Sequence, residues 1–113
     1  MIADISLLMS NFTIMNVDKL ENKILRWAYD RNLLDENNAP KQMLKVMEEV
    51  GELASAVAKK DEEQTIDAIG DVLVTIIILS AQLNLRPFEC LEVAYNEIAE
   101  RKGTTVNGVF IKE

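Results

Sequence analysis

The apolar segment Val72–Leu79 and the two aspartates before it constrain the fold more than any other part of the chain. This segment carries apolar residues on nearly every side of a helix, so we expect it to form a central, buried helix. Asp67 and Asp71 lie one helical turn apart, directly before the segment. Two like charges at the edge of a core repel each other and lose hydration, and a divalent cation would offset both effects. The segment therefore predicts a metal site at the start of a core helix.

A second acidic cluster, formed by Glu48, Glu49 and Glu52, lies on another predicted helix. Their spacing of three and four residues places the three carboxylates on adjoining turns. An apolar stripe on the same helix, expected to face the core, consists of Met43, Val46, Met47, Val50, Leu53, Ala54 and Val57. Alone, the acidic cluster is typical of a solvated surface. Its pairing with Asp67 and Asp71 favours a Mg²⁺ site, because Mg²⁺ prefers carboxylate oxygens and often joins them to phosphates.

Composition excludes several classes of function. The 113 residues fit one domain, and a hydrophobic fraction of 49% is sufficient for a core. The net charge of −7 argues against a nucleic-acid partner and against binding to an anionic membrane. The absence of His removes His-based catalysis and ordinary zinc sites. Cys90 is the single cysteine; we expect it to pack as a small apolar residue, and the composition favours a cytoplasmic location.

Residues 1–14 are predicted to form an N-terminal extension of a domain that spans residues 15–113. They lack the basic region and cleavage site of a signal peptide, and they are too short to span a membrane. Helix-capping residues and prolines then mark four helices, at Val17–Arg31, 40–57, Glu62–Leu83 and 87–102, followed by a tail. We expect an all-α four-helix bundle. The Ile-rich third helix offers more apolar surface than three neighbours can cover, so we also expect a homodimer or homotetramer.

Two residues outside the acidic clusters are candidates for substrate contact. Trp27 either fills core volume or forms a flat wall against which a nucleobase stacks. Lys45 lies four residues before Glu49. It either forms an ordinary helix ion pair with Glu49, the interpretation that we favour, or contacts a phosphate.

The acidic clusters resemble the motif of the all-alpha nucleoside triphosphate pyrophosphohydrolase superfamily, the MazG-like group. That motif is E-E-x-x-E followed, after a helix-sized gap, by E-x-x-D. Its first half is matched by Glu48, Glu49 and Glu52, and its closing aspartate is matched by Asp71. Ala68 stands where the family usually has a glutamate, and Asp67, one residue earlier, is the candidate replacement. A shift of one residue rotates a side chain by about 100° around a helix.

The resemblance implies Mg²⁺-dependent hydrolysis of a nucleoside triphosphate to the monophosphate and pyrophosphate, with Mn²⁺ as a possible substitute. Glu49, Glu52 and Asp71, with Asp67, would hold the cation. Glu48 or a neighbouring glutamate would accept a proton from the attacking water.

The C-terminal segment also resembles phage and bacterial MazG-like proteins, in the runs Tyr95-Asn96, Arg101-Lys102-Gly103 and Gly108-Val109-Phe110. By that resemblance, Asn96, Arg101 and Lys102 would contact the sugar or the phosphates. The alternative is that the two cations only complement a helix dipole.

Two other interpretations remain open. The first is a helical dimerisation module of the same family that has lost catalysis, as the replacement at Ala68 would allow. The second is a relative that hydrolyses another phosphoanhydride, such as a phosphoribosyl nucleotide. The chain contains neither a Walker phosphate-binding motif nor a Rossmann motif.

Overall fold

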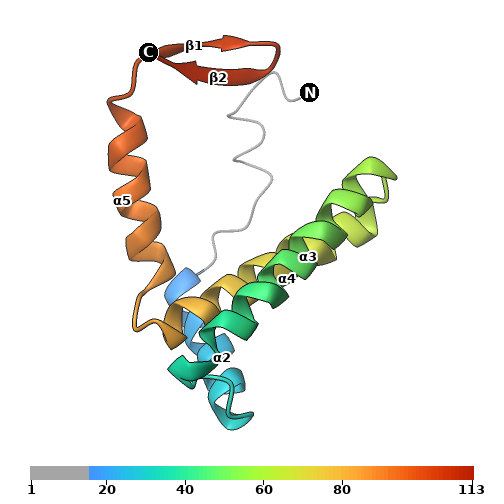
Figure 1. The fold of residues 1–113 in the computed structure, drawn as a ribbon, viewed down its shortest axis with the longest axis vertical. Coiled ribbons are helices and arrows are strands. Elements are labelled where there is room, and N and C mark those ends of the chain that lie inside the picture. The colour runs from blue at the N-terminus through green and yellow to red at the C-terminus, as the bar shows by residue number, and fades with distance from the viewer. Residues whose placement is uncertain (1–15) are drawn as a thin grey trace.

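The computed structural model describes residues 16–113, which form four α-helices, a short 3₁₀-helix and a C-terminal β-hairpin (Figure 1). In chain order these elements are α2 (Val17–Asp30), η1 (Glu36–Asn38), α3 (Ala39–Ala58), α4 (Glu62–Gln82), α5 (Pro87–Ala99), β1 (Gly103–Val106) and β2 (Val109–Lys112). The predicted extension at residues 1–14 lies outside the described residues. The prediction of a mostly helical chain with four helices is confirmed.

The helix starts follow the predicted capping residues. The side chain of Asn16 accepts a hydrogen bond from the Lys19 N–H at 3.0 Å, and that of Asp61 accepts one from the Gln64 N–H at 3.1 Å. Each carboxyl or amide oxygen thereby satisfies an N–H group that has no partner inside its helix. After the helices, Asn32, Lys60 and Asn84 adopt φ values of 59°, 57° and 57°, the left-handed conformation that often ends a helix.

The antiparallel pair of α3 and α4 is the centre of the fold, and α2 packs across one end of α4 (Figure 1). Small and branched residues fill the contacts among these three helices: Ala28, Val46, Ala56, Ala68, Ile77 and Ile78 are all buried. The alanines allow close approach of the helix backbones. This arrangement leaves a polar seam between α3 and α4, where the acidic clusters meet.

The prediction that the apolar stripe of α3 faces the core is wrong. Met47 and Val57, both in the apolar stripe, are 58% and 57% exposed, whereas Glu49 is only 8% exposed. Val46 lies at the edge of the stripe and is the stripe residue that is buried. The helix is therefore rotated so that its acidic side, rather than its apolar side, faces α4.

α4 occupies the predicted central position, but only part of its surface is covered. Ile77 and Ile78 are buried, while Ile66, Ile69 and Leu73, nearer its N-terminus, are exposed. By length and composition α4 could cross a membrane, a test that the core helices of soluble proteins also pass. Its contacts with α2, α3 and α5 identify it here as the central packing helix.

The fourth helix does not close a bundle, which corrects the predicted four-helix arrangement. Among the described elements, α5 contacts only α4, and the hairpin β1–β2 contacts no other helix or strand (Figure 1). The radius of gyration is 16.6 Å, compared with about 13 Å for a compact chain of this length. Cys90 is exposed on α5 instead of packed, because no second helix covers it. We call α5 and the hairpin, residues 87–112, the C-terminal arm.

The predicted tail is a β-hairpin. α5 ends at Ala99, earlier than the predicted stop at Gly103, which instead begins β1. A Cβ atom at Gly103 would overlap the Ile111 carbonyl and the Phe110 ring of the opposite strand. Asn107 and Gly108, with φ values of 51° and 79°, form the two-residue turn typical of an Asn-Gly hairpin.

Candidate functional site

Glu52 of the second acidic cluster and the aspartate pair line a cavity of about 310 Å³ between α3 and α4. We call it the acidic cavity; it is lined by Glu52, Ser55 and Ala56 from α3 and by Gln64, Asp67, Ala68 and Asp71 from α4. Asp67 and Asp71 share this wall because residues four apart lie on one helix face. Ala68 contributes a buried methyl group at the position where the family motif has a carboxylate.

The electrostatics of the acidic cavity are those of crowded carboxylates. Burial, together with the negative charges of Asp67 and Glu49, raises the pKa of Asp71 above its ordinary value. The pKa of Glu52 is raised mainly by a hydrogen bond with the Glu49 carboxyl group and by repulsion from the Glu49 charge. Each raised pKa means that the ionised form of the carboxyl group is disfavoured, because neighbouring negative charges are not balanced by enough positive charge.

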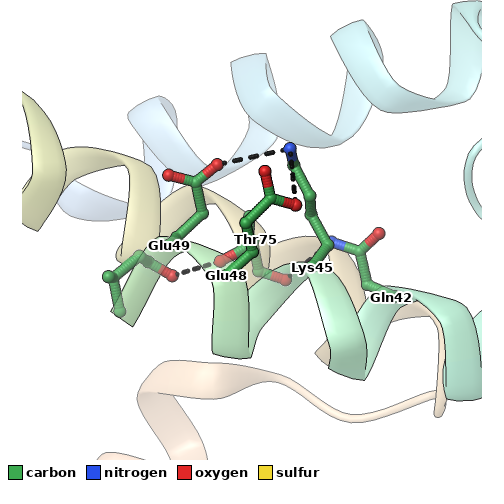
Figure 2. Close-up of polar contacts among 6 residues, drawn as sticks. Gln42, Lys45, Glu48, Glu49 and Thr75 are labelled. Atoms are coloured by element: carbon green, nitrogen blue, oxygen red, sulfur yellow. Dashed lines mark hydrogen bonds and ion pairs between the residues drawn. The ribbon is translucent and has the colours of Figure 1, made fainter. Parts of the chain in front are cut away.

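Glu49 is the most buried of these carboxylates. Its Oε1 atom lies 3.4 Å from the Lys45 Nζ, while its Oε2 atom is buried and has no hydrogen-bond partner (Figure 2). An ionised oxygen without a partner is costly to bury. The same lysine also pairs with the exposed Glu48 at 3.4 Å. One ammonium group is thus shared between two carboxylates and cannot neutralise the whole cluster.

A larger cavity, of about 610 Å³, continues from the acidic cavity toward α2. We call it the central cavity; it is lined by Trp27, Leu33, Asn38, Lys41, Gln42, Lys45, Glu49, Asp71, Val74, Thr75, Ile78 and Gln82. Its walls combine apolar side chains with amide, hydroxyl and ammonium groups, the usual composition of a small-molecule site. Asp71 lines both cavities, so the two spaces share an acidic edge.

The acidic residues fit a hard divalent cation in their chemistry. Every candidate ligand is a carboxylate, the donor that Mg²⁺ and Mn²⁺ prefer. Within residues 16–113, no three acidic side chains lie close enough together, as they stand, to form a ligand set. They approach instead as two pairs, Glu49 with Glu52 and Asp67 with Asp71, on facing helices. The unpartnered Oε2 of Glu49 is the observation that best fits a role in holding a cation.

The remaining predicted site residues line neither of the two cavities. Glu48 is exposed and lines neither cavity, although its partner Lys45 borders the central one. Asn96, Arg101 and Lys102 belong to the C-terminal arm and also line neither cavity. The Arg101 guanidinium donates to the Glu97 carboxylate at 2.9 Å, one turn earlier on α5.

Trp27 lies at the mouth of the central cavity rather than in the core. It is 48% exposed and lines the cavity from α2. The Arg31 guanidinium stacks on the indole ring, with 4.3 Å from its carbon to the ring centroid, and donates to the Trp27 carbonyl at 3.0 Å. These contacts hold the indole in place while it remains partly exposed. The exposure of Trp27 argues against the interpretation that it fills core volume, and the interpretation that it stacks on a nucleobase stays a prediction.

Three uncharged residues of the central cavity are not indicated by the acidic motif: Gln42, Thr75 and Gln82. The Gln42 Nε2 donates to the Thr75 carbonyl at 3.1 Å (Figure 2), and the Gln82 Nε2 donates to the Leu33 carbonyl at 2.7 Å. A signal for two of them exists in the sequence. Thr75 and Gln82 interrupt an apolar helix at positions four and eleven residues after Asp71, which places all three on one face.

Comparisons with known proteins identify the family of the chain. The family model of the MazG nucleotide pyrophosphohydrolase domain matches residues 38–104, which contain α3, α4 and α5. An uncharacterised 18.2 kDa protein, from the rep-hol intergenic region of Haemophilus phage HP1, is 43% identical over 67 residues. That match covers 59% of this chain and 41% of the phage protein, so the chain spans less than half of its relative. No solved structure matches the chain. Because the family model matches more than half of its residues, the chain belongs to the MazG nucleotide pyrophosphohydrolase domain family.

Proposed function

We propose that the protein hydrolyses a nucleoside triphosphate to the nucleoside monophosphate and pyrophosphate, with Mg²⁺ as the metal and Mn²⁺ as a substitute. One observation carries this proposal: Asp71 lines both the acidic cavity and the larger, partly apolar central cavity. A cation held by the residues of that shared edge would neutralise the phosphates of a nucleotide whose nucleoside occupied the central cavity. Membership of the family supports the class of reaction.

Glu49, Glu52, Asp67 and Asp71 are the residues that would hold the cation. Asp67 is on the same wall of the acidic cavity as Asp71, so it compensates for the alanine at position 68. When bound, the cation neutralises phosphate charge and orients a water molecule for attack. Glu48 or a neighbouring glutamate accepts the proton of that water, because the chain has no histidine.

The proposed nucleotide contacts come from two helices around the central cavity, α2 and α3. Trp27 provides a flat face for the base, and its stacking on Arg31 keeps that face in place. Lys41 and Lys45 line the same cavity from α3 and supply positive charge for the phosphates. Lys45, whose ammonium group pairs with Glu48 and Glu49, would be available for phosphate contact if these glutamates held a cation.

The C-terminal arm supports assembly into a homodimer or homotetramer. Leu91, Val93 and Tyr95 on α5 are 61%, 70% and 61% exposed, and the arm has no covering element in the described part of the chain except α4. Apolar surface on this scale is typical of an interface. In such an assembly, Asn96, Arg101 and Lys102 would reach the nucleotide site of a second copy.

The test is release of pyrophosphate from a panel of NTPs and dNTPs, with Mg²⁺, with Mn²⁺ and with EDTA. We expect metal-dependent release by the native chain, and at least a hundredfold loss in Glu49→Gln, which removes the buried charge. Glu92→Gln, an equal change of charge on the exposed surface of α5, is the control.

Failure of the folded native chain to cleave any nucleotide would refute the proposal and favour a dimerisation module without catalysis. Full activity in Glu49→Gln would remove Glu49 from the site. Cleavage of a phosphoribosyl nucleotide, but of no triphosphate, would assign the site to a different phosphoanhydride.

A further inference from the structure

The central cavity contains a polar group whose hydrogen bonding is incomplete, and this group lies at the end away from the acidic edge. Asp71, Thr75 and Gln82 form a polar stripe along the face of α4 that lines the cavity. The eleven residues from Asp71 to Gln82 correspond to about 16 Å along the helix axis. This distance is comparable with an extended nucleotide, so a base would lie near Gln82 when the phosphates lie near Asp71.

The orientation of the Gln82 amide follows from its one hydrogen bond. The side chain is 4% exposed, and its Nε2 donates to the Leu33 carbonyl at 2.7 Å. A carbonyl oxygen can only accept, so the nitrogen must be the amide atom that faces Leu33. The Oε1 atom is therefore directed elsewhere; it is buried and has no partner. Buried acceptors without partners are uncommon in folded proteins, and one that lines a cavity is a candidate for ligand contact.

The second glutamine of the cavity is oriented by the same kind of contact. The Gln42 Nε2 donates to the Thr75 carbonyl at 3.1 Å, which leaves its oxygen as the free end of the amide (Figure 2). Val74 and Ile78 on α4 add apolar surface to the same cavity. The wall of the cavity therefore contains two amide groups whose oxygens are not used in the hydrogen bonds that orient them, in a partly apolar setting where an unmatched polar atom is strongly disfavoured.

We propose that Gln82 makes the nucleotide site selective for bases that carry an exocyclic amino group, such as cytosine and adenine. The amino group donates to the Gln82 Oε1, whereas the oxo group of uracil or hypoxanthine would place one acceptor against another. Because the oxygen is shielded in the free protein, entry of the base is accompanied by a small displacement of the surrounding side chains. This inference rests on the proposed function, and it names the substrate class of that same site.

The test compares nucleotide pairs that differ at the exocyclic group, dCTP with dUTP and dATP with dITP, in the presence of Mg²⁺. We expect kcat/KM to be at least about tenfold higher for the amino member of each pair, the effect of leaving a buried polar group unmatched. In Gln82→Met the ratio should fall to about one. The neighbouring Leu83→Met, at a half-exposed position that lines neither cavity, should keep the native ratio.

Each outcome separates this inference from the proposed function. Equal cleavage within both pairs by the native chain overturns the inference and leaves the hydrolase proposal intact. A native preference that persists in Gln82→Met overturns the role of Gln82. If Gln82→Met does not fold, the kcat/KM ratios of the native chain for the two nucleotide pairs test the selectivity on their own. If no nucleotide is cleaved, the hydrolase proposal fails. The selectivity is then tested by measuring the affinities for dCMP and dUMP by Trp27 fluorescence, and equal affinities overturn the inferred selectivity.

Discussion

Replacing Asp71 by asparagine is expected to have opposite effects on stability in the absence and in the presence of a divalent cation. Without a cation, the substitution removes a partly buried charge that is repelled by Asp67 and Glu49, the interactions that raise the pKa of Asp71. The variant should therefore unfold at a higher temperature than the native chain in EDTA. With a cation, the native chain gains binding free energy that the variant largely lacks.

The two effects differ in size. A like-charge pair four residues apart on a helix costs about 0.2–0.5 kcal/mol. Since about 1 kcal/mol shifts the melting temperature of a domain of this size by about 4–8 °C, we expect Asp71→Asn to melt about 1–4 °C higher in EDTA. A cation at one hundred times its dissociation constant stabilises the native chain by about 2.7 kcal/mol, which corresponds to about 10–20 °C. The order of the two melting temperatures should therefore reverse.

Thermal unfolding followed by circular dichroism, at neutral pH with EDTA and then with increasing Mg²⁺ or Mn²⁺, measures both effects in one series. Glu92→Gln, which changes the net charge equally on an exposed part of α5, should follow the native chain in both conditions. A lower melting temperature for Asp71→Asn in EDTA would refute the repulsion inferred from the cavity. An equal Mg²⁺ response in variant and native chain would remove Asp71 from the cation site.

Three further results are expected. First, Trp27 is the single tryptophan, so nucleotide binding should change the intrinsic fluorescence; Trp27→Ala should raise KM about tenfold with a smaller effect on kcat, and Trp27→Phe should retain most of the affinity. Second, because the pKa of Asp71 is raised in the folded state, its ionisation opposes folding: in EDTA the melting temperature of the native chain, relative to that of Asp71→Asn, should fall as the pH rises above about 4, the ordinary pKa of an aspartic acid, and level off once Asp71 is ionised in the folded state. Third, light scattering at micromolar concentration should give a mass of two or four chains, and Val93→Glu on the exposed side of α5 should reduce it; a native mass of one chain would contradict the assembly.

The features that the sequence predicts correctly depend on neighbours along the chain. Asn16 and Asp61 begin helices because their side chains reach an N–H group three residues away, a contact that needs no tertiary structure. Asp67 and Asp71 share a wall because a helix places residues four apart on one face. The acidic half of the site is therefore accessible to pattern analysis before any packing is known.

The parts that the sequence does not predict depend on contacts between distant segments. The amide of Gln82 is oriented by the carbonyl of Leu33, 49 residues earlier, and no local pattern indicates that pair. The division of the seam into two cavities likewise depends on how α2 crosses α4. Spacing alone indicates that Thr75 and Gln82 face the same way as Asp71, but it does not show that a cavity lies in front of them.

The rotation of α3 shows why an apolar stripe does not by itself identify the core of one chain. A stripe indicates that a helix face avoids water, and either the same chain or a second copy can cover it. Here α3 directs Glu49 toward α4, where two facing acidic groups can share a cation, and leaves Met47 and Val57 exposed. The C-terminal arm leaves Leu91 and Val93 uncovered in the same way. Both departures from the predicted bundle have one explanation in the proposed homo-oligomer: polar faces meet within a chain to form the site, and apolar faces meet between chains to stabilise it.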